Sequence, residues 1–186
     1  MLRTTTIFLF LCSLAACTQS GRGAHSASNY LILTEDPDTG QTYYTDEAGQ
    51  TAIPPEKYAM CLTDTFRTHA IVLLQGRNQW AVIDRQEEIL YEIFTYDNGP
   101  DYPSEGLFRI VQNGKIGYAD AATYAIIIQP QFDCAFPFEN GNAKVSTNCQ
   151  TIKDGEYSIW TSEDWQYVDR AGNISENDPT SYNNEK

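Results

Sequence analysis

IGYADAATYAIIIQPQFDCAFPFENGNAKV, residues 116–145, is the stretch that decides the fold of this chain. An aliphatic and aromatic run ends at Asp120, the polar turn AATY follows, and the apolar strand Ala125–Ile128 comes next. After the aromatic Phe132, the tripeptide ENG at residues 139–141 is a turn signal, and the alternating AKV behind it marks a return strand. The stretch therefore predicts a β-hairpin with one further strand.

The same pattern occurs four times along the chain. Each copy ends in an aspartate, and the position two residues earlier is apolar or aromatic and is expected to face the core. The copies are TYYTD at 42–46, WAVID at 80–84, IGYAD at 116–120 and WQYVD at 165–169, with core-facing positions Tyr44, Val82, Tyr118 and Tyr167. The aspartates are 38, 36 and 49 residues apart, and an insertion over residues 146–164 stretches the last spacing. A period near 36 predicts an all-β domain of stacked hairpin or three-strand repeats.

Three segments carry a family resemblance: NGKIGYAD at 113–120, QPQFDCAFPF at 129–138 and SEGLFRI at 104–110. They resemble the tryptophan-glycine (WG) repeat family of bacterial proteins, and the resemblance covers residues 40–174. No copy keeps both residues of the namesake dipeptide, since Trp80 precedes an alanine and Ile116 precedes the glycine. The resemblance implies an all-β repeat fold, and it brings no catalytic residues because the family is known mainly as a structural repeat.

Composition limits the function classes. Of the 186 residues, 41% are hydrophobic and 20% are charged, which is typical of one globular domain. Twelve Lys and Arg against 25 Asp and Glu give a net charge of -13. Nucleic acid is therefore not an expected partner. A protein partner of basic character is expected instead.

The N-terminus reads as an export signal. A single charge, Arg3, precedes the short apolar run IFLFLC at residues 7–12, and LAAC at residues 14–17 resembles a bacterial lipobox. The resemblance implies cleavage before Cys17 and acylation of its thiol, so the expected location is the cell envelope. Thr18 after it resembles lipoproteins of an outer membrane, facing the periplasm or the surface. The expected divisions are a signal peptide (1–16), a lipidated N-terminus with a flexible tether (17–29), the β-repeat domain (30–174) and a disordered tail (175–186).

Three cysteines remain after the signal peptide and the lipidated residue: Cys61, Cys134 and Cys149. An exported domain enters an oxidising compartment, so one pair is expected to form a disulfide. Cys134 lies before the ENG turn and Cys149 follows it, where residue 134 faces about 146, and this favours the Cys134–Cys149 pair. Cys61 is then a buried free thiol, although a curved stack leaves Cys61 open as a partner of either cysteine.

Candidate site residues are sparse. Exposed aromatics on one sheet face, Tyr43, Tyr91, Tyr96 and Tyr102, are candidates for stacking on a sugar or clasping a peptide. A catalytic triad is not expected, because His25 lies in the tether and His69 lies at a turn. Neither a metal nor a cofactor is expected: the segment starting at Asp36 mimics a calcium loop, but its sixth position is Gln41 where that loop needs glycine.

These observations favour an envelope lipoprotein whose β-repeat domain is a protein-interaction or structural module without catalytic activity. Three alternatives stay open. An envelope hydrolase would use a facing pair of carboxylates, such as Glu87 with Glu88 or Asp97 with Asp101. A carbohydrate-binding module would use the tyrosines, and a protective, immunity-like protein would bind a basic secreted target through the acidic surface.

Overall fold

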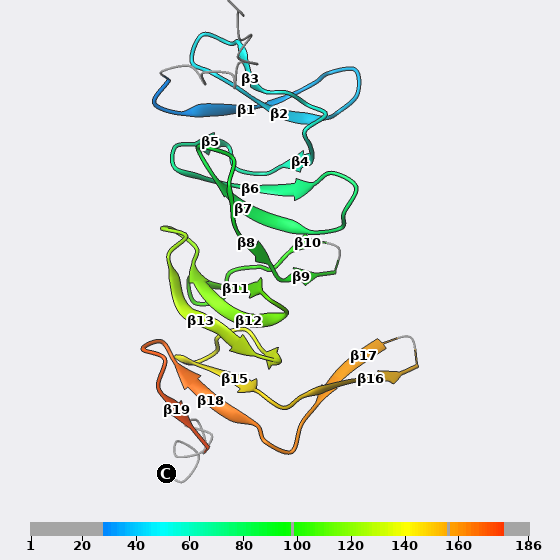
Figure 1. Ribbon diagram of the computed structural model, residues 1–186, viewed down its shortest axis with the longest axis vertical. Helices are drawn as coiled ribbons and strands as arrows, with labels where there is room; N and C mark the ends of the chain where they lie inside the picture. The colour runs from blue at the N-terminus through cyan, green and yellow to red at the C-terminus, as the bar shows by residue number, and fades with distance from the viewer. Residues whose placement is uncertain (1–27, 98, 156, 177–186) are drawn as a thin grey trace, which may run out of the picture.

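The computed structural model describes residues 28–97, 99–155 and 157–176, and within these ranges the protein consists of strands and turns, without a helix. The all-β class predicted from the sequence is therefore confirmed. The strands are stacked along one long axis, from β1 near one end to β19 at the other (Figure 1). Among the described residues there is thus no helix of the length and apolarity needed to cross a bilayer. The signal peptide, Cys17 and tail residues 177–186 lie outside the described residues.

The strands of the described residues form three larger antiparallel sheets and two hairpins of two strands each. The first sheet has the order β3 (Thr51–Ile53), β2 (Thr42–Thr45), β1 (Leu31–Glu35), β5 (Thr65–Phe66). The second has the order β13 (Ile126–Phe132), β12 (Lys115–Asp120), β11 (Leu107–Gln112), β8 (Ile89–Ile93), β7 (Trp80–Asp84), β6 (His69–Leu74), β4 (Tyr58–Cys61). The third has the order β14 (Cys134–Ala135), β15 (Asn142–Ser146), β18 (Gln166–Asp169), β19 (Ile174–Ser175). The hairpins are β9 (Thr95–Tyr96) with β10 (Gly99–Pro100), and β16 (Gln150–Asp154) with β17 (Tyr157–Thr161).

The core-facing position two residues before the repeat aspartate is confirmed in three copies. Tyr44, Val82 and Tyr118 are buried. In the fourth copy the prediction is wrong, because Val168 is buried while Tyr167 is only half-buried. Strands inside the stack are covered on both faces, whereas β18 lies next to the two-residue β19 at the end of the stack (Figure 1). Within β18 only Val168 is buried.

Each repeat aspartate holds its own turn. Oδ1 of Asp120 accepts hydrogen bonds from the N–H groups of Ala122 (3.0 Å) and Thr123 (2.8 Å) and from the Thr123 hydroxyl (2.9 Å). Asp36, outside the four copies, makes the same three bonds in DPDTG, which forms the β1–β2 hairpin. In the other copies Oδ1 accepts from the N–H groups two and four residues ahead, at 2.8–3.0 Å, in Asp46, Asp84 and Asp169. The repeated aspartate is thus a turn residue whose carboxylate replaces missing backbone partners.

Steric crowding explains why Gly117, the glycine of the WG dipeptide position in the third copy, is a glycine. In β12 and β13, Ile116 pairs with Phe132 and Tyr118 pairs with Ile128, so a bulge around Pro130 lies opposite Gly117. A Cβ atom on Gly117 would lie 2.4 Å from the carbonyl oxygen of Ile128 and 2.6 Å from the nitrogen of Pro130. The two backbones approach so closely that only glycine fits there.

We expect Gly117→Ala to destabilise the protein by about 2 kcal/mol, because the bulge must move to make room for the methyl group. Gly99→Ala is the matched control, since a Cβ there meets its nearest atom at an ordinary 3.7 Å. That control should change stability by less than about 0.5 kcal/mol. Urea unfolding of both variants measures the difference, and equal midpoints would contradict the steric explanation.

The aspartate turns should also set the acid stability. Hydrogen bonds from Thr123 lower the pKa of Asp120, and bonds within their own turns likewise lower the pKa of Asp36 and Asp169. A lowered folded-state pKa means that the stabilisation is fully present above the ordinary value of 3.8 and is lost as the pH falls through the folded-state pKa.

Asp120→Asn should keep the hydrogen-bond acceptor, so we expect a shallower loss of stability than in the wild type between about pH 4 and about pH 2. Asp120→Ala removes the acceptor and should be less stable at neutral pH than the wild type and than Asp120→Asn. Denaturant unfolding of the three proteins over this pH series is the measurement. An Asp120→Asn variant with the wild-type pH dependence would show that the Asp120 carboxylate does not contribute to the acid dependence of stability.

Candidate functional site

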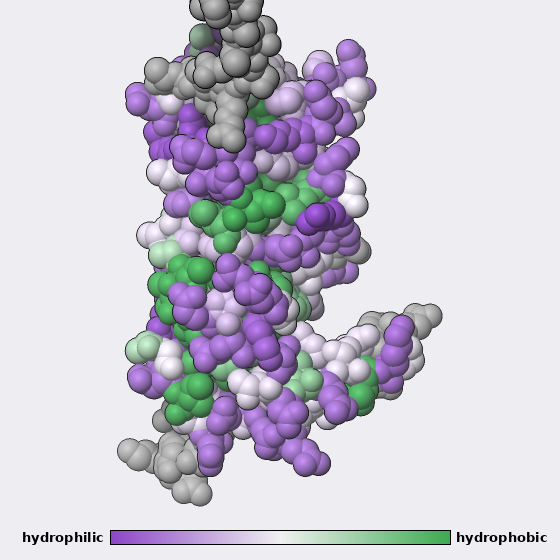
Figure 2. Space-filling model, viewed as in Figure 1, coloured by the Kyte–Doolittle hydropathy of each residue, from purple (hydrophilic) through white to green (hydrophobic). Residues whose placement is uncertain are grey.

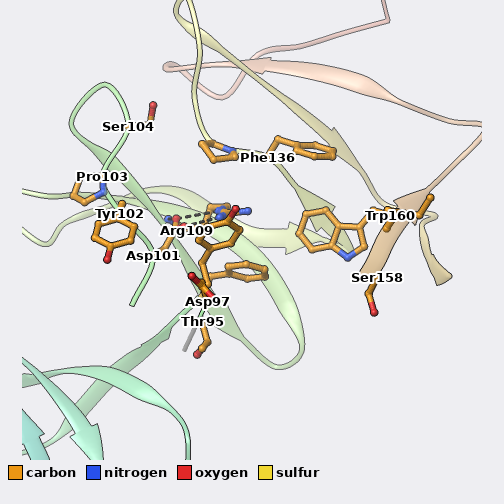
Figure 3. A pocket seen from close by; sticks show the side chains of 14 residues that line it. Thr95, Asp97, Asp101, Tyr102, Pro103, Ser104, Arg109, Phe136, Ser158 and Trp160 are labelled. Carbon is orange, nitrogen blue, oxygen red and sulfur yellow. Dashed lines mark hydrogen bonds and ion pairs between the residues drawn. The ribbon is translucent and has the colours of Figure 1, made fainter. Parts of the chain in front are cut away.

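The main candidate site is a cleft of about 810 Å³ in the lower half of the stack. In Figure 2 the β16–β17 arm projects from the body and leaves an open notch between them. The segments Phe94–Asp97 and Asp101–Ser104 of the second repeat form one side of the cleft, Phe136 and Pro137 belong to the third repeat, and Ser158–Trp160 of the arm form the other side (Figure 3).

Local sequence explains how two repeats come to share this cleft. The turns Ser104–Leu107 and Glu139–Asn142 are both two-residue hairpin turns, and Asn140 and Gly141 have the positive φ values that such a turn needs. The Ser104 hydroxyl donates to the carbonyl oxygen of Phe138 at 2.6 Å, and the Gly141 N–H donates to the Glu105 carboxylate at 3.0 Å. Each turn thus holds the equivalent turn of the next repeat.

A buried ion pair lies at the base of the cleft. The guanidinium of Arg109 on β11 donates to both carboxylate oxygens of Asp101, and the backbone N–H of Arg109 donates to the same carboxylate at 2.8 Å. A third side-chain bond reaches the carbonyl oxygen of Ala135 at 3.1 Å. Arg109 is 5% and Asp101 8% exposed, and the guanidinium also stacks 4.2 Å from the centroid of Phe94. A buried pair bound this completely fixes the shape of the cleft and leaves no net charge at its base.

The walls of the cleft are aromatic. Tyr96 is 58% exposed and Tyr102 is 73% exposed, which is unusual for large rings in a small domain. On the arm, Trp160 packs edge-on against Phe94 at 5.7 Å and Phe136 at 5.5 Å. Aromatic rings with one free face are suited to stacking on a ligand.

The insertion that stretches the last spacing builds the arm. Cys134 on β14 and Cys149, directly before β16, are joined by a disulfide with their Cα atoms 5.9 Å apart. Cys134 lies opposite Ser146, the register expected for a hairpin about Asn140. Cys61 is buried and free, and its burial raises the pKa of the thiol to about 11. The disulfide therefore holds the base of the arm to the third repeat.

The structure brings together only two of the four tyrosines proposed as one binding surface. Tyr96 and Tyr102 line the cleft. Tyr91 is a correction: it is 4% exposed in the hydrophobic core, and its hydroxyl donates to the carbonyl oxygen of Tyr124 at 2.7 Å. Tyr43 is half-buried on β2, in the first sheet, so it does not share a face with the cleft. Alternation within a strand did not reveal these faces, because inner strands of the stack are covered on both sides.

The other chemical candidates have structural roles in the described residues. Asp101 is bound by Arg109 rather than facing Asp97, and Glu87 forms an ion pair with Lys57 at 2.7 Å. His69 begins β6 instead of lying in a turn, and its ring is 5.5 Å from that of Tyr124. In the parts of the chain that the structure describes, no group of three or more His, Cys, Asp or Glu side chains is placed to hold a metal ion.

Sequence reasoning named Asp101 only as a partner of Asp97, and it missed the other residues that shape the cleft: Phe94, Arg109, Phe136 and Trp160. Asp101 and Arg109 are eight residues apart on different segments, so no local pattern pairs them. One signal was available for Trp160, because it lies within the insertion that breaks the regular spacing. Insertions into a repeat array form loops on one face, and that face is often the binding face.

The stacked antiparallel units and the shared turns define a β-repeat protein. Residues 80–115 and 117–148 match the family model of the WG containing repeat, so these two segments are WG repeats. The matched segments are the second and third copies, which supply most of the cleft. Comparison with curated proteins and with solved structures gives no significant match.

Removing the disulfide should loosen the arm and little else. In the double variant Cys134→Ser with Cys149→Ser, we expect faster amide hydrogen exchange in β16 and β17, since the arm loses the covalent link that holds its base to the third repeat. The control Cys61→Ser keeps the crosslink, so its arm should exchange as in the wild type. Peptide mapping without reductant should recover a fragment linking Cys134 to Cys149, and a link from Cys61 would contradict this assignment.

Proposed function

We propose that this protein is a lipid-anchored module of the bacterial cell envelope that binds a protein partner in the cleft. The observation that carries the proposal is the combination of two highly exposed tyrosines, Tyr96 and Tyr102, with a base fixed by the Arg109–Asp101 pair. Exposed rings above a rigid base are pre-organised for binding, which lowers the entropy cost of association.

The chemistry of the cleft favours binding over catalysis. Both oxygens of Asp101 accept hydrogen bonds from Arg109, so this carboxylate has no free proton-transfer role. The net charge of -13 supports a partner of basic character, and exposed charges of this kind mainly accelerate association at low salt.

The envelope location is supported by the sequence alone. The segment LAAC at residues 14–17 resembles a lipobox, so Cys17 is the residue that we propose to carry the acyl chains. Two or three acyl chains give durable membrane attachment where one does not.

One experiment tests both parts of the proposal in intact cells. The photo-crosslinking residue p-benzoylphenylalanine replaces Tyr102, with replacement of the exposed Met60 on β4 as the matched control outside the cleft. We expect ultraviolet light to give a discrete protein adduct in the membrane fraction from position 102 only. The yield should fall as salt rises, because the charges are screened within about 8 Å at physiological ionic strength.

The anchor is tested in the same strain with Cys17→Ser. This variant should leave the membrane fraction, because it lacks the thiol that would be acylated. Adducts of equal yield at positions 60 and 102 would contradict the cleft as binding site. A Cys17→Ser protein that stays in the membrane fraction would contradict the lipid anchor.

A further inference from the structure

One edge of the arm borders the cleft. Strand β17 pairs with β16, and within the described residues no other strand pairs with it. Three consecutive residues of β17, Ser158–Trp160, line the cleft, whereas no residue of β16 whose side chain the structure describes does. Side chains of a strand alternate between its two faces, so three consecutive lining residues mean that the strand borders the cleft with its backbone edge. In Figure 1 β17 is the arm strand nearer to the β9–β10 hairpin.

This edge offers unpaired backbone groups. In an antiparallel pair, every second residue of a strand directs its N–H and C=O away from its partner. The arm has two strands, a size that is marginally stable by itself, and it is held here by the disulfide and by the packing of Trp160. A third strand along β17 would satisfy these groups and complete a small sheet.

We infer that the cleft binds an extended segment of the partner protein, which pairs with β17 as a third strand of the arm. This inference rests on the proposed function, because it takes the cleft as the interaction site and adds the form of the bound segment. Main-chain pairing supplies affinity in such β-strand additions, and the side chains supply selectivity.

The lining indicates which side chains the segment carries. Tyr96, Tyr102 and Pro103 line the same cleft as β17 and suit aliphatic side chains at alternate positions. Arg109 is neutralised by Asp101, while Asp97 on the lining is exposed. With a chain charge of -13, charge complementarity favours a segment that alternates basic and aliphatic residues. The C-terminal residues 177–186 of the chain itself are a poorer occupant, since Asp178 and Glu185 outnumber Lys186.

The test uses three fluorescein-labelled synthetic peptides and the oxidised protein. The probe is acetyl-Lys-Val-Lys-Val-Lys-Val-amide. The second peptide has N-methyl groups on all six residues, which removes the N–H donors from both edges, and the third carries Glu in place of Lys. By fluorescence anisotropy the probe should bind, and each of the two other peptides should bind about tenfold more weakly or not at all.

Variants locate the site. Tyr102→Ala should weaken probe binding about fivefold, as expected for an aromatic contact residue. Ile152→Ala is the control, because Ile152 is exposed on β16 of the same arm and does not line the cleft. Its affinity should equal that of the wild type. Saturating probe should also slow amide hydrogen exchange at Ser158–Trp160 relative to the free protein.

Strand addition is overturned if the N-methylated peptide binds as tightly as the probe, if exchange in β17 is unchanged, or if none of the peptides binds. Binding of chitotriose in the cleft, lost in Tyr102→Ala while all peptides fail, would replace it with a saccharide site. The cross-linked adduct at position 102 tests the protein-interaction function independently of strand addition. If the adduct persists while the peptides fail, the interaction module stands and strand addition falls.

Discussion

The bond from an aspartate carboxylate to the backbone of its own turn is the interaction on which the rest of the fold depends. It occurs once per repeat, at Asp46, Asp84, Asp120 and Asp169, and a residue with positive φ follows each time. The turn lies between two antiparallel strands and fixes their register, and register decides which side chains are buried. In the first three copies, a one-residue slip at this point would turn the side chain two positions earlier to the opposite face of its strand.

Because the chain reverses direction at the same aspartate turn in every repeat, equivalent contacts recur along the stack. The hydroxyl of Tyr44 donates to the carbonyl oxygen of Thr63, and that of Tyr118 donates to the carbonyl oxygen of Phe136. Tyr44 packs on Phe66 at 5.3 Å and Tyr118 on Phe138 at 4.9 Å. Equivalent positions of the first and third copies therefore pack in the same way, and an insertion can leave the array without disturbing the copies on either side. The arm is such an insertion, and the disulfide attaches it where the regular packing ends.

The sequence was sufficient for the features that depend on local chemistry. The period, the ENG turn and three of the four core positions follow from residue types at fixed spacing. It was insufficient where a second segment decides the outcome. Tyr167 is displaced from the core because its repeat is the last one, and Tyr91 is covered by a neighbouring strand that single-strand alternation does not report. The Arg109–Asp101 pair and the crowding of Gly117 by the bulge likewise exist only after two separate segments have met.

The cleft combines a rigid part with a part of lower local stability. Its base is made by repeats that hold each other through Ser104 and Glu105, and by a buried ion pair whose groups are all bonded. Its outer wall is a two-stranded arm held by the disulfide and by hydrogen bonds of Ser162 at its base, and by the packing of Trp160. Since the arm makes few contacts beyond its base, its position can adjust to a ligand at small cost to the stack. Rigid repeats therefore give the site its shape, and the insertion gives it the adaptability that a regular repeat array lacks.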